Sequence, residues 1–171
     1  MGRKSPLSET EIGDPNHSHA FAVALLSRRD YSTRELRFKL KERGYLEHAI
    51  EPVLIDLEET RKLDDARYGA NVVASRSRRA LGPARIRGEL KRKGVASETI
   101  EQAIAGGEGE QAPDFAHLAR QARVRKFGPE LPTDWKEKAR QARFLQYRGF
   151  STDHIRAALD GDLEVDDGGQ P

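Results

Sequence analysis

One pattern of apolar and polar positions occurs three times along this chain, each time around a glycine. An apolar residue lies four positions before the glycine and a basic residue one position before it, and further apolar residues follow six and ten positions after it. The glycines are Gly44, Gly94 and Gly149, which lie 50 and 55 residues apart. A nearly fixed period of this size is typical of a tandem array of one supersecondary unit. Such arrays form elongated molecules with long binding surfaces.

Each of these glycines predicts the end of one helix and the start of the next. A glycine supplies the left-handed residue that ends a helix, and a basic residue just before it suits the negative end of the helix dipole. The apolar residues four positions before the glycines are expected in the core: Leu40, Leu90 and Leu145. The apolar pairs after the glycines share one helix face because they are spaced i, i+4: Ile50 and Leu54, Ile100 and Ile104, Ile155 and Leu159.

A further helix precedes each of these helix pairs. The expected first helices run over about 19–29, 65–79 and 114–126. Ser32 and Glu35 have the spacing of a capping box, which predicts the start of the second helix of the first copy. Pro83 is expected at the first position of the corresponding helix in the second copy, and a long helix is expected over 133–148 in the third. No segment alternates with period two, so we expect no sheet.

The predicted fold class is therefore all-α, with three tandem three-helix repeats forming an elongated, curved molecule. The repeats are expected at 17–61, 62–106 and 113–160, with a linker at 107–112. The polar segment 1–16 and the acidic segment 161–171 are expected to be disordered tails.

Composition limits the possible classes of function. The chain has 34% charged and 6% aromatic residues, which suits several small three-helix cores better than one thick core. It has no cysteine, so a disulfide framework or a thiolate metal site is excluded. No segment has the length and apolar character of a signal peptide core or a membrane span. We therefore expect a cytoplasmic protein without membrane contact.

The positive charge is concentrated in the second and third repeats. Residues 20–60 hold 7 basic and 8 acidic residues, whereas 61–93 hold 11 basic and 3 acidic, and 119–148 hold 9 basic and 3 acidic. A surface that served stability alone would intersperse acids, as the first repeat does. A basic stripe is the usual sign of a polyanionic partner. The candidate binding residues form two clusters: Arg76, Arg78, Arg79, Arg85, Arg87, Lys91, Arg92 and Lys93, then Arg120, Arg123, Arg125, Lys126, Lys136, Lys138, Arg140, Arg143 and Arg148.

Other residues that could carry chemistry have simpler interpretations. We expect Asp64 and Asp65 to cap a helix, because no third metal ligand lies near them in sequence. The histidines show no metal-binding spacing. Trp135 begins a long helix and is interpreted as a core anchor, with stacking on a nucleic-acid base as the alternative. We therefore expect no catalytic residue, no metal and no cofactor.

Four stretches of the chain together resemble the RecX family of regulators of the RecA recombinase. Their order and spacing carry the resemblance, which spans about residues 20–159. The stretches are 24–29 (Ala-Leu-Leu-Ser-Arg-Arg) with 32–40, 63–68 (Leu-Asp-Asp-Ala-Arg-Tyr), 82–95 from Gly-Pro-Ala-Arg-Ile to Lys-Gly-Val, and 144–155 with Phe-Leu and Arg-Gly-Phe-Ser. Two positions depart from the family pattern: Tyr68 stands where Phe is typical, and Gly69 where Ala is typical.

The resemblance implies three tandem three-helix repeats and a function in DNA repair, homologous recombination and the SOS response. It implies a monomer that binds the RecA nucleoprotein filament along its groove and inhibits the ATPase, strand-exchange and coprotease activities of RecA. Single-stranded DNA would be a weak, non-specific partner. The alternative is a helical-repeat protein that binds one DNA sequence, because helix–glycine–helix pairs resemble helix-turn-helix units. The expected starts of the third helices are acidic and poor for reading bases. An enzyme is disfavoured because no catalytic constellation is evident.

Overall fold

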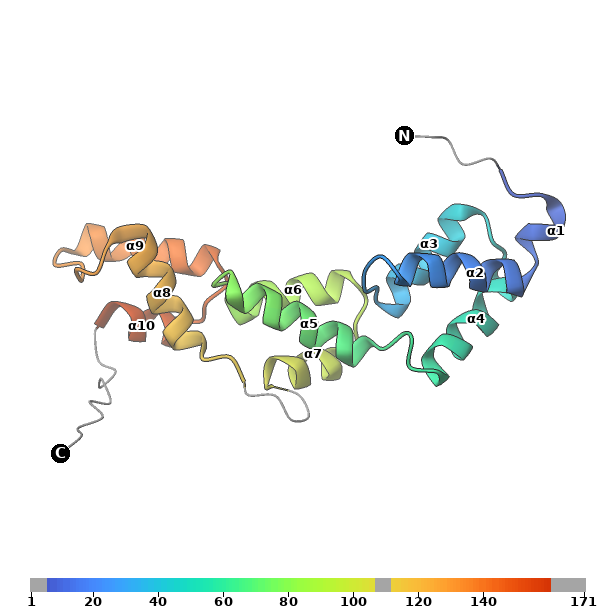
Figure 1. The fold of residues 1–171 in the computed structure, drawn as a ribbon. Helices are drawn as coiled ribbons and strands as arrows, with labels where there is room; N and C mark the ends of the chain where they lie inside the picture. Colours follow the sequence, from blue (N-terminus) through green and yellow to red (C-terminus); the bar gives the residue numbers. More distant parts are fainter. Residues whose placement is uncertain (1–5, 107–111, 161–171) are drawn as a thin grey trace, which may run out of the picture. The chain divides into compact units, whose positions relative to one another are not determined.

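The computed structural model describes residues 6–106 and 112–160, and all regular structure in these residues is helical (Figure 1). This confirms the predicted all-α fold class. The helices are α1 Glu9–Ile12, α2 Pro15–Leu26, α3 Thr33–Arg43, α4 Glu47–Glu59, α5 Asp65–Arg78, α6 Pro83–Arg92, α7 Ser97–Ile104, α8 Phe115–Phe127, α9 Trp135–Tyr147 and α10 Thr152–Asp160. The expected linker, up to residue 111, and the acidic tail at 161–171 lie outside the described residues.

The glycines that define the repeat end helices as expected. Their φ angles are +110°, +80° and +89° for Gly44, Gly94 and Gly149, which is the left-handed region. The three leucines four positions before these glycines are 0% exposed. Within the first repeat α2 and α3 pack on α4, and within the third α8 and α9 pack on α10. The predicted core register is therefore confirmed.

The structure differs from the expected disordered tail at residues 8–16. Ser8 and Glu11 form a capping box that starts the short helix α1. Asp14 then caps α2 through the backbone N–H of Asn16, and Pro15 occupies the first position of that helix. Helix α2 therefore begins four residues earlier than the apolar pattern predicted, because its first turn is stabilised by caps rather than by apolar burial.

The helices divide into two compact units whose boundaries do not follow the repeats. One unit comprises residues 1–71 and 90–103, and the other comprises 72–89 and 104–171. The boundaries fall within α5, within α6 and before the last residue of α7, all helices of the second repeat. Each end of α6 is bound to a different neighbouring repeat, and these two attachments, called joints below, explain the division.

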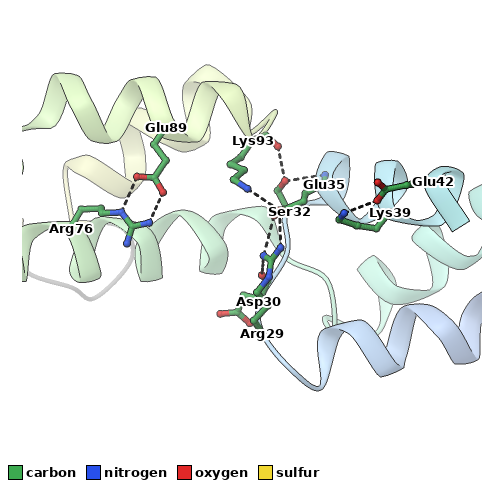
Figure 2. Close-up of polar contacts among 9 residues, drawn as sticks. All are labelled: Arg29, Asp30, Ser32, Glu35, Lys39, Glu42, Arg76, Glu89 and Lys93. Atoms are coloured by element: carbon green, nitrogen blue, oxygen red, sulfur yellow. Dashed lines mark hydrogen bonds and ion pairs between the residues drawn. The ribbon is translucent and has the colours of Figure 1, made fainter. Parts of the chain in front are cut away.

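The first joint attaches the C-terminal end of α6 to the start of α3 (Figure 2). The Ser32 hydroxyl donates a 2.6 Å hydrogen bond to the carbonyl oxygen of Lys93. The Lys93 ammonium in turn donates to the Glu35 carboxylate at 2.8 Å, which also accepts from the Arg29 guanidinium at 2.8 Å. One basic residue before the repeat glycine thus binds the preceding repeat through both its main chain and its side chain.

Only half of the predicted capping box at the start of α3 forms. The Ser32 hydroxyl does accept from the Glu35 N–H at 3.2 Å, as a helix cap should. The Glu35 carboxylate does not return to the Ser32 backbone, because it is bound by Arg29 and Lys93 instead. Another N–H of this helix start, that of Thr33, is satisfied by the Asp65 carboxylate at 2.8 Å.

The second joint attaches the end of α9 to the start of α6. The Gly82 N–H donates to the Arg148 carbonyl at 2.8 Å, and the Ala84 N–H donates to the Gly149 carbonyl at 3.1 Å. The first N–H groups of a helix and its last carbonyls have no partner within that helix. Here the N–H groups at the start of α6 pair with the carbonyls at the end of α9, so both sets are satisfied.

Both joints need glycine because a Cβ atom there would overlap atoms of the neighbouring repeat. A Cβ atom on Gly94 would lie 2.1 Å from the Cδ atom and 2.6 Å from the Cβ atom of Arg34. A Cβ atom on Gly149 would lie 2.6 Å from the Cβ atom of Arg85, and one on Gly82 would lie 2.2 Å from the carbonyl carbon of Gly149. By contrast, a Cβ atom on Gly44 would meet only the Cδ1 atom of Leu7, at 4.0 Å.

Alanine at the joint glycines is expected to destabilise the fold more than alanine at Gly44. All three positions require a left-handed conformation, which costs an L-residue about 1–2 kcal/mol. Gly94→Ala and Gly149→Ala also force a steric overlap, worth typically a further 1–3 kcal/mol, whereas a Cβ on Gly44 lies 4.0 Å from Leu7. Urea unfolding of the three variants measures the difference. Equal losses in all three would show that the close approach contributes nothing.

The first joint is expected to weaken in acid through Glu35. Burial raises the pKa of Glu35, but the hydrogen bonds and charges of Arg29 and Lys93 outweigh this and leave the pKa below its ordinary value. The ionised carboxylate therefore stabilises the fold above pH 5, and this stability is lost as the pH falls through the lowered pKa. Glu35→Gln should reduce the free energy of unfolding by about 1–2 kcal/mol at pH 7.

Unfolding measured at several pH values separates the contribution of the ionised Glu35 carboxylate from any other effect of the substitution. The difference between wild type and Glu35→Gln should shrink once the pH falls below about 4.3, the ordinary pKa of glutamate, because the unfolded chain then binds a proton that folded Glu35 resists. Asp65, whose pKa is raised by burial, is present in both proteins and does not affect the difference. Urea titrations at several pH values measure it, and a constant difference down to pH 3 would rule out the ionised joint.

Candidate nucleic-acid interface

Some of the basic residues predicted to bind a partner are used instead to hold the fold together. Arg76 makes a two-pronged ion pair with Glu89, with nitrogen–oxygen distances of 2.8 and 2.5 Å (Figure 2). Lys93 is part of the first joint. Arg148 is part of the second, where its guanidinium donates to the carbonyls of Ala80 at 3.0 Å and Arg79 at 2.6 Å. These contacts give the three side chains structural roles.

Among the candidate binding residues, Arg123 differs most clearly from its predicted exposure at the surface. It is only 3% exposed, and its guanidinium donates to three carbonyls of the loop between α8 and α9: Glu130 at 2.8 Å, Pro129 at 3.0 Å and Gly128 at 3.4 Å. Burial, and secondly the charge of Arg120, lowers the pKa of Arg123 below its ordinary value. Arg123 therefore shapes a loop and presents no charge to a partner.

Several other candidates are exposed but have intramolecular partners. Lys138 pairs with Asp160 at 2.6 Å, and Arg140 pairs with Glu137 at 2.9 Å. Exposed pairs of this kind contribute little to stability, so a polyanion can replace the acid. Arg87 and Arg120 are half-buried.

Eight candidates are exposed and make no hydrogen bond or ion pair through their side chains with any described residue. They come from α5, α6, α8 and α9 and from the residue after α5. They are Arg78, Arg79, Lys91, Arg92, Arg125, Lys126, Lys136 and Arg143. An acidic partner would bind a surface with this many unpaired basic side chains.

Four arginines of the second unit lie near one another around the second joint. The pKa of Arg148 is lowered by burial first and then by the positive charges of Arg125, Arg85 and Arg79. These three side chains are exposed and come from α8, from α6 and from the residue after α5. The joint therefore gathers basic residues that are up to 69 positions apart in sequence.

Three acid-free stretches meet at this place. Residues 76–88, 115–129 and 138–152 contain thirteen basic residues and no aspartate or glutamate. The second joint connects the first stretch to the third, and the rings of Phe127 and Phe144 connect the second to the third by an edge-on contact at 5.2 Å. The gathering of bases is thus a property of the fold, although the sequence already shows the lack of acids.

The interpretation of Trp135 as a core anchor is wrong. Its side chain is 82% exposed, at the first position of α9. Helix α9 buries Gln141 and Leu145, and Trp135 lies about 80° around the helix from Leu145 at 3.6 residues per turn. The apolar face of the helix therefore excludes it.

A second exposed aromatic residue, Tyr147, was not recognised from the sequence. It is the last residue of α9, and its side chain is 78% exposed. The Arg85 guanidinium lies 5.3 Å from the centre of its ring, and Arg85 donates to its carbonyl at 3.3 Å. The sequence signal was available: Tyr147 lies two positions before Gly149, away from the face of Leu145, within an acid-free stretch.

The fold and the charge distribution define an all-helical repeat protein with a strongly basic surface, and comparisons with known proteins specify the family. The chain matches the models "RecX, first three-helix domain" at residues 20–57, "RecX, second three-helix domain" at 64–104 and "RecX, third three-helix domain" at 114–159. This chain belongs to the RecX family, which confirms the resemblance and the three three-helix repeats.

Individual relatives agree with this assignment. The chain is 41% identical over 148 residues to "Regulatory protein RecX" of Halorhodospira halophila, covering 86% of this chain and 89% of the relative. It is 44% identical over 138 residues to the protein of the same name from Vibrio parahaemolyticus, covering 81% and 86%. The crystal structure of RecX from Lactobacillus salivarius shares the fold, with a TM-score of 0.72 at 18% identity, covering 90% of this chain and 97% of that one.

No helix in the described part of the chain is both long and apolar enough to cross a membrane.

Replacing Arg123 is expected to destabilise the fold, in contrast to other bases of its helix. Arg123→Met keeps much of the side-chain volume but leaves carbonyls of the loop at 128–130 without their donor. Losing the hydrogen bonds of a buried charged side chain costs about 1.5–3 kcal/mol. Lys126→Met, on the same helix but exposed, should change the free energy of unfolding by less than about 0.5 kcal/mol. Thermal melts compare the two, and similar small losses would return Arg123 to the list of binding candidates.

Proposed function

We propose that this protein is a non-enzymatic regulator that binds the RecA–DNA filament along its groove and inhibits the ATPase, strand-exchange and coprotease activities of RecA. Membership of the RecX family, in which the relatives from Halorhodospira halophila and Vibrio parahaemolyticus are named regulatory proteins, supports the regulatory role. The acid-free basic surface of the second unit is the observation that carries the proposed contact with a nucleoprotein filament.

The basic surface supports binding to phosphates rather than to one base sequence. Its exposed arginines and lysines lie on four helices, and apart from Lys138 and Arg140 they have no acidic partner within the described residues. Contacts between such side chains and phosphates give affinity and orientation but carry no sequence information. Single-stranded DNA should therefore bind weakly, without sequence preference and with strong dependence on salt.

The starts of the third helices argue against the sequence-specific alternative. In a helix-turn-helix unit the first turn of the second helix contacts base edges. Here those turns carry Glu47, Glu98 and Asp153 on α4, α7 and α10. Glu47 is moreover bound to Arg37 and Lys41. Acidic first turns would repel the phosphates on either side of a groove.

A titration of the protein into a RecA ATPase assay on single-stranded DNA tests the proposal. We expect ATP hydrolysis to fall as the protein is added, because a protein bound along the groove bridges subunits and blocks the small motions that turnover requires. Unchanged or increased hydrolysis at a stoichiometric amount of protein would contradict inhibition. A preference for one duplex sequence in a parallel binding assay would favour the alternative.

Charge reversal on the second unit should weaken inhibition more than the same reversal on the first. Arg78→Glu with Arg143→Glu turns two unpaired exposed charges from attraction to repulsion, and should raise the concentration for half-inhibition on the order of tenfold or more at low salt. Arg28→Glu with Lys62→Glu changes the net charge equally, on exposed residues of the first unit. Equal effects of the two pairs in the ATPase titration would mean that overall charge, and not this surface, determines binding.

A further inference from the structure

The exposed ring of Tyr147 lies in the most basic region of the second unit without any evident role in packing. Its side chain is 78% exposed, so burial does not explain an aromatic residue there. Its carbonyl accepts from Arg85, but any residue could supply that oxygen. The Arg85 guanidinium lies against the ring, 5.3 Å from its centre, and this contact holds the ring at the surface.

The surroundings of the ring are suited to a chain of phosphates. Arg79, Arg85 and Arg125 are exposed, and all three exert their charge on Arg148, the next residue after the tyrosine. The side chains of Arg79 and Arg125 make no hydrogen bond or ion pair within the described residues. The three stretches that meet here, 76–88, 115–129 and 138–152, contain no aspartate or glutamate. An exposed aromatic face beside unpaired bases is the arrangement by which proteins bind single-stranded nucleic acids.

We infer that Tyr147 is a stacking platform for one base of a single-stranded nucleic acid, with Arg79, Arg85 and Arg125 binding the phosphates on either side of that base. The inference deepens the proposed function by assigning the nucleic-acid contact to a particular ring, yet it requires no RecA. A duplex does not fit this mode, since its bases are already stacked and paired. A protein partner is disfavoured because three exposed arginines without an intervening acid match a regular row of negative charges.

Fluorescence anisotropy with a labelled oligothymidine and no RecA tests the inference. Tyr147→Ala should weaken binding on the order of tenfold, because the stacking of a base on an aromatic ring is lost. Tyr147→Phe should bind as wild type does, because the ring is retained. Phe38→Ala serves as the control, since Phe38 is also exposed, at 60%, but lies in the near-neutral first repeat; it should have no effect.

An abasic oligonucleotide of the same length identifies the source of the loss. It has the phosphates but no bases, so wild type and Tyr147→Ala should bind it equally. An equal loss on both oligonucleotides, or no loss on either, would overturn the stacking role. Circular dichroism and thermal melts should show all variants folded, because the Tyr147 side chain contributes little buried area.

The ATPase titration distinguishes failure of this inference from failure of the proposed function. If wild type inhibits RecA but Tyr147→Ala binds oligothymidine normally, the regulator stands and the platform is wrong. If Tyr147→Ala loses affinity for oligothymidine alone while wild type leaves RecA unaffected, the platform stands and the regulator is wrong. Loss of RecA inhibition by Tyr147→Ala with unchanged DNA binding would assign the ring to a protein contact and overturn the inference.

Discussion

The joint between the end of one helix and the start of another is the constraint on which the rest of this structure depends. Small three-helix repeats bury few side chains, and each leaves unpaired carbonyls and N–H groups at its helix ends. The two joints satisfy these groups reciprocally, in one case by the Ser32 hydroxyl and in the other by the N–H groups of Gly82 and Ala84. Both ends of α6 are used in this way, so the second repeat is divided between the two compact units.

The joints also decide which basic residues are available to a partner. Lys93 and Arg148 occupy the same position in their repeats, one residue before the glycine, and both bind the neighbouring repeat. Because Arg148 is positioned by two carbonyls, exposed arginines from three other elements are brought near it. A contact that stabilises the fold therefore also concentrates positive charge. Counting charges in the sequence could not tell the basic residues that hold the repeats together from those that are free to bind a partner.

The sequence predicted what depends on local periodicity. The three glycine stops, the buried leucines at 40, 90 and 145, the N-cap Ser32 and the first-position Pro83 all follow from residue type and spacing, and the structure confirms them. The start of α2 was placed too late because its first turn is polar.

The sequence could not predict contacts whose acceptors are main-chain carbonyls far away in the chain. Arg123 resembles any other base in its cluster until the loop at 128–130 folds over it. Glu35 was assigned to a local cap because Lys93, its distant partner, is 58 positions away. Trp135 was placed in the core by residue type alone, although its angle around α9 directs it outwards. The role of each of these side chains thus depends on long-range contacts and on its angle around the helix, which composition does not specify.

The use of main-chain atoms in the joints has a consequence for how the repeats can diverge. A peptide carbonyl or N–H is offered by almost every residue. Identity in the joints is therefore restricted only at the close-approach glycines, at the base before the repeat glycine, and at Ser32 and Glu35 of the first joint. The helix starts that receive these groups already differ, as Ser32-Thr33-Arg34 in one joint and Gly82-Pro83-Ala84 in the other. Descendants of one duplicated segment can therefore lose nearly all resemblance to one another while their attachment stays the same, and each copy is left free to acquire its own surface chemistry.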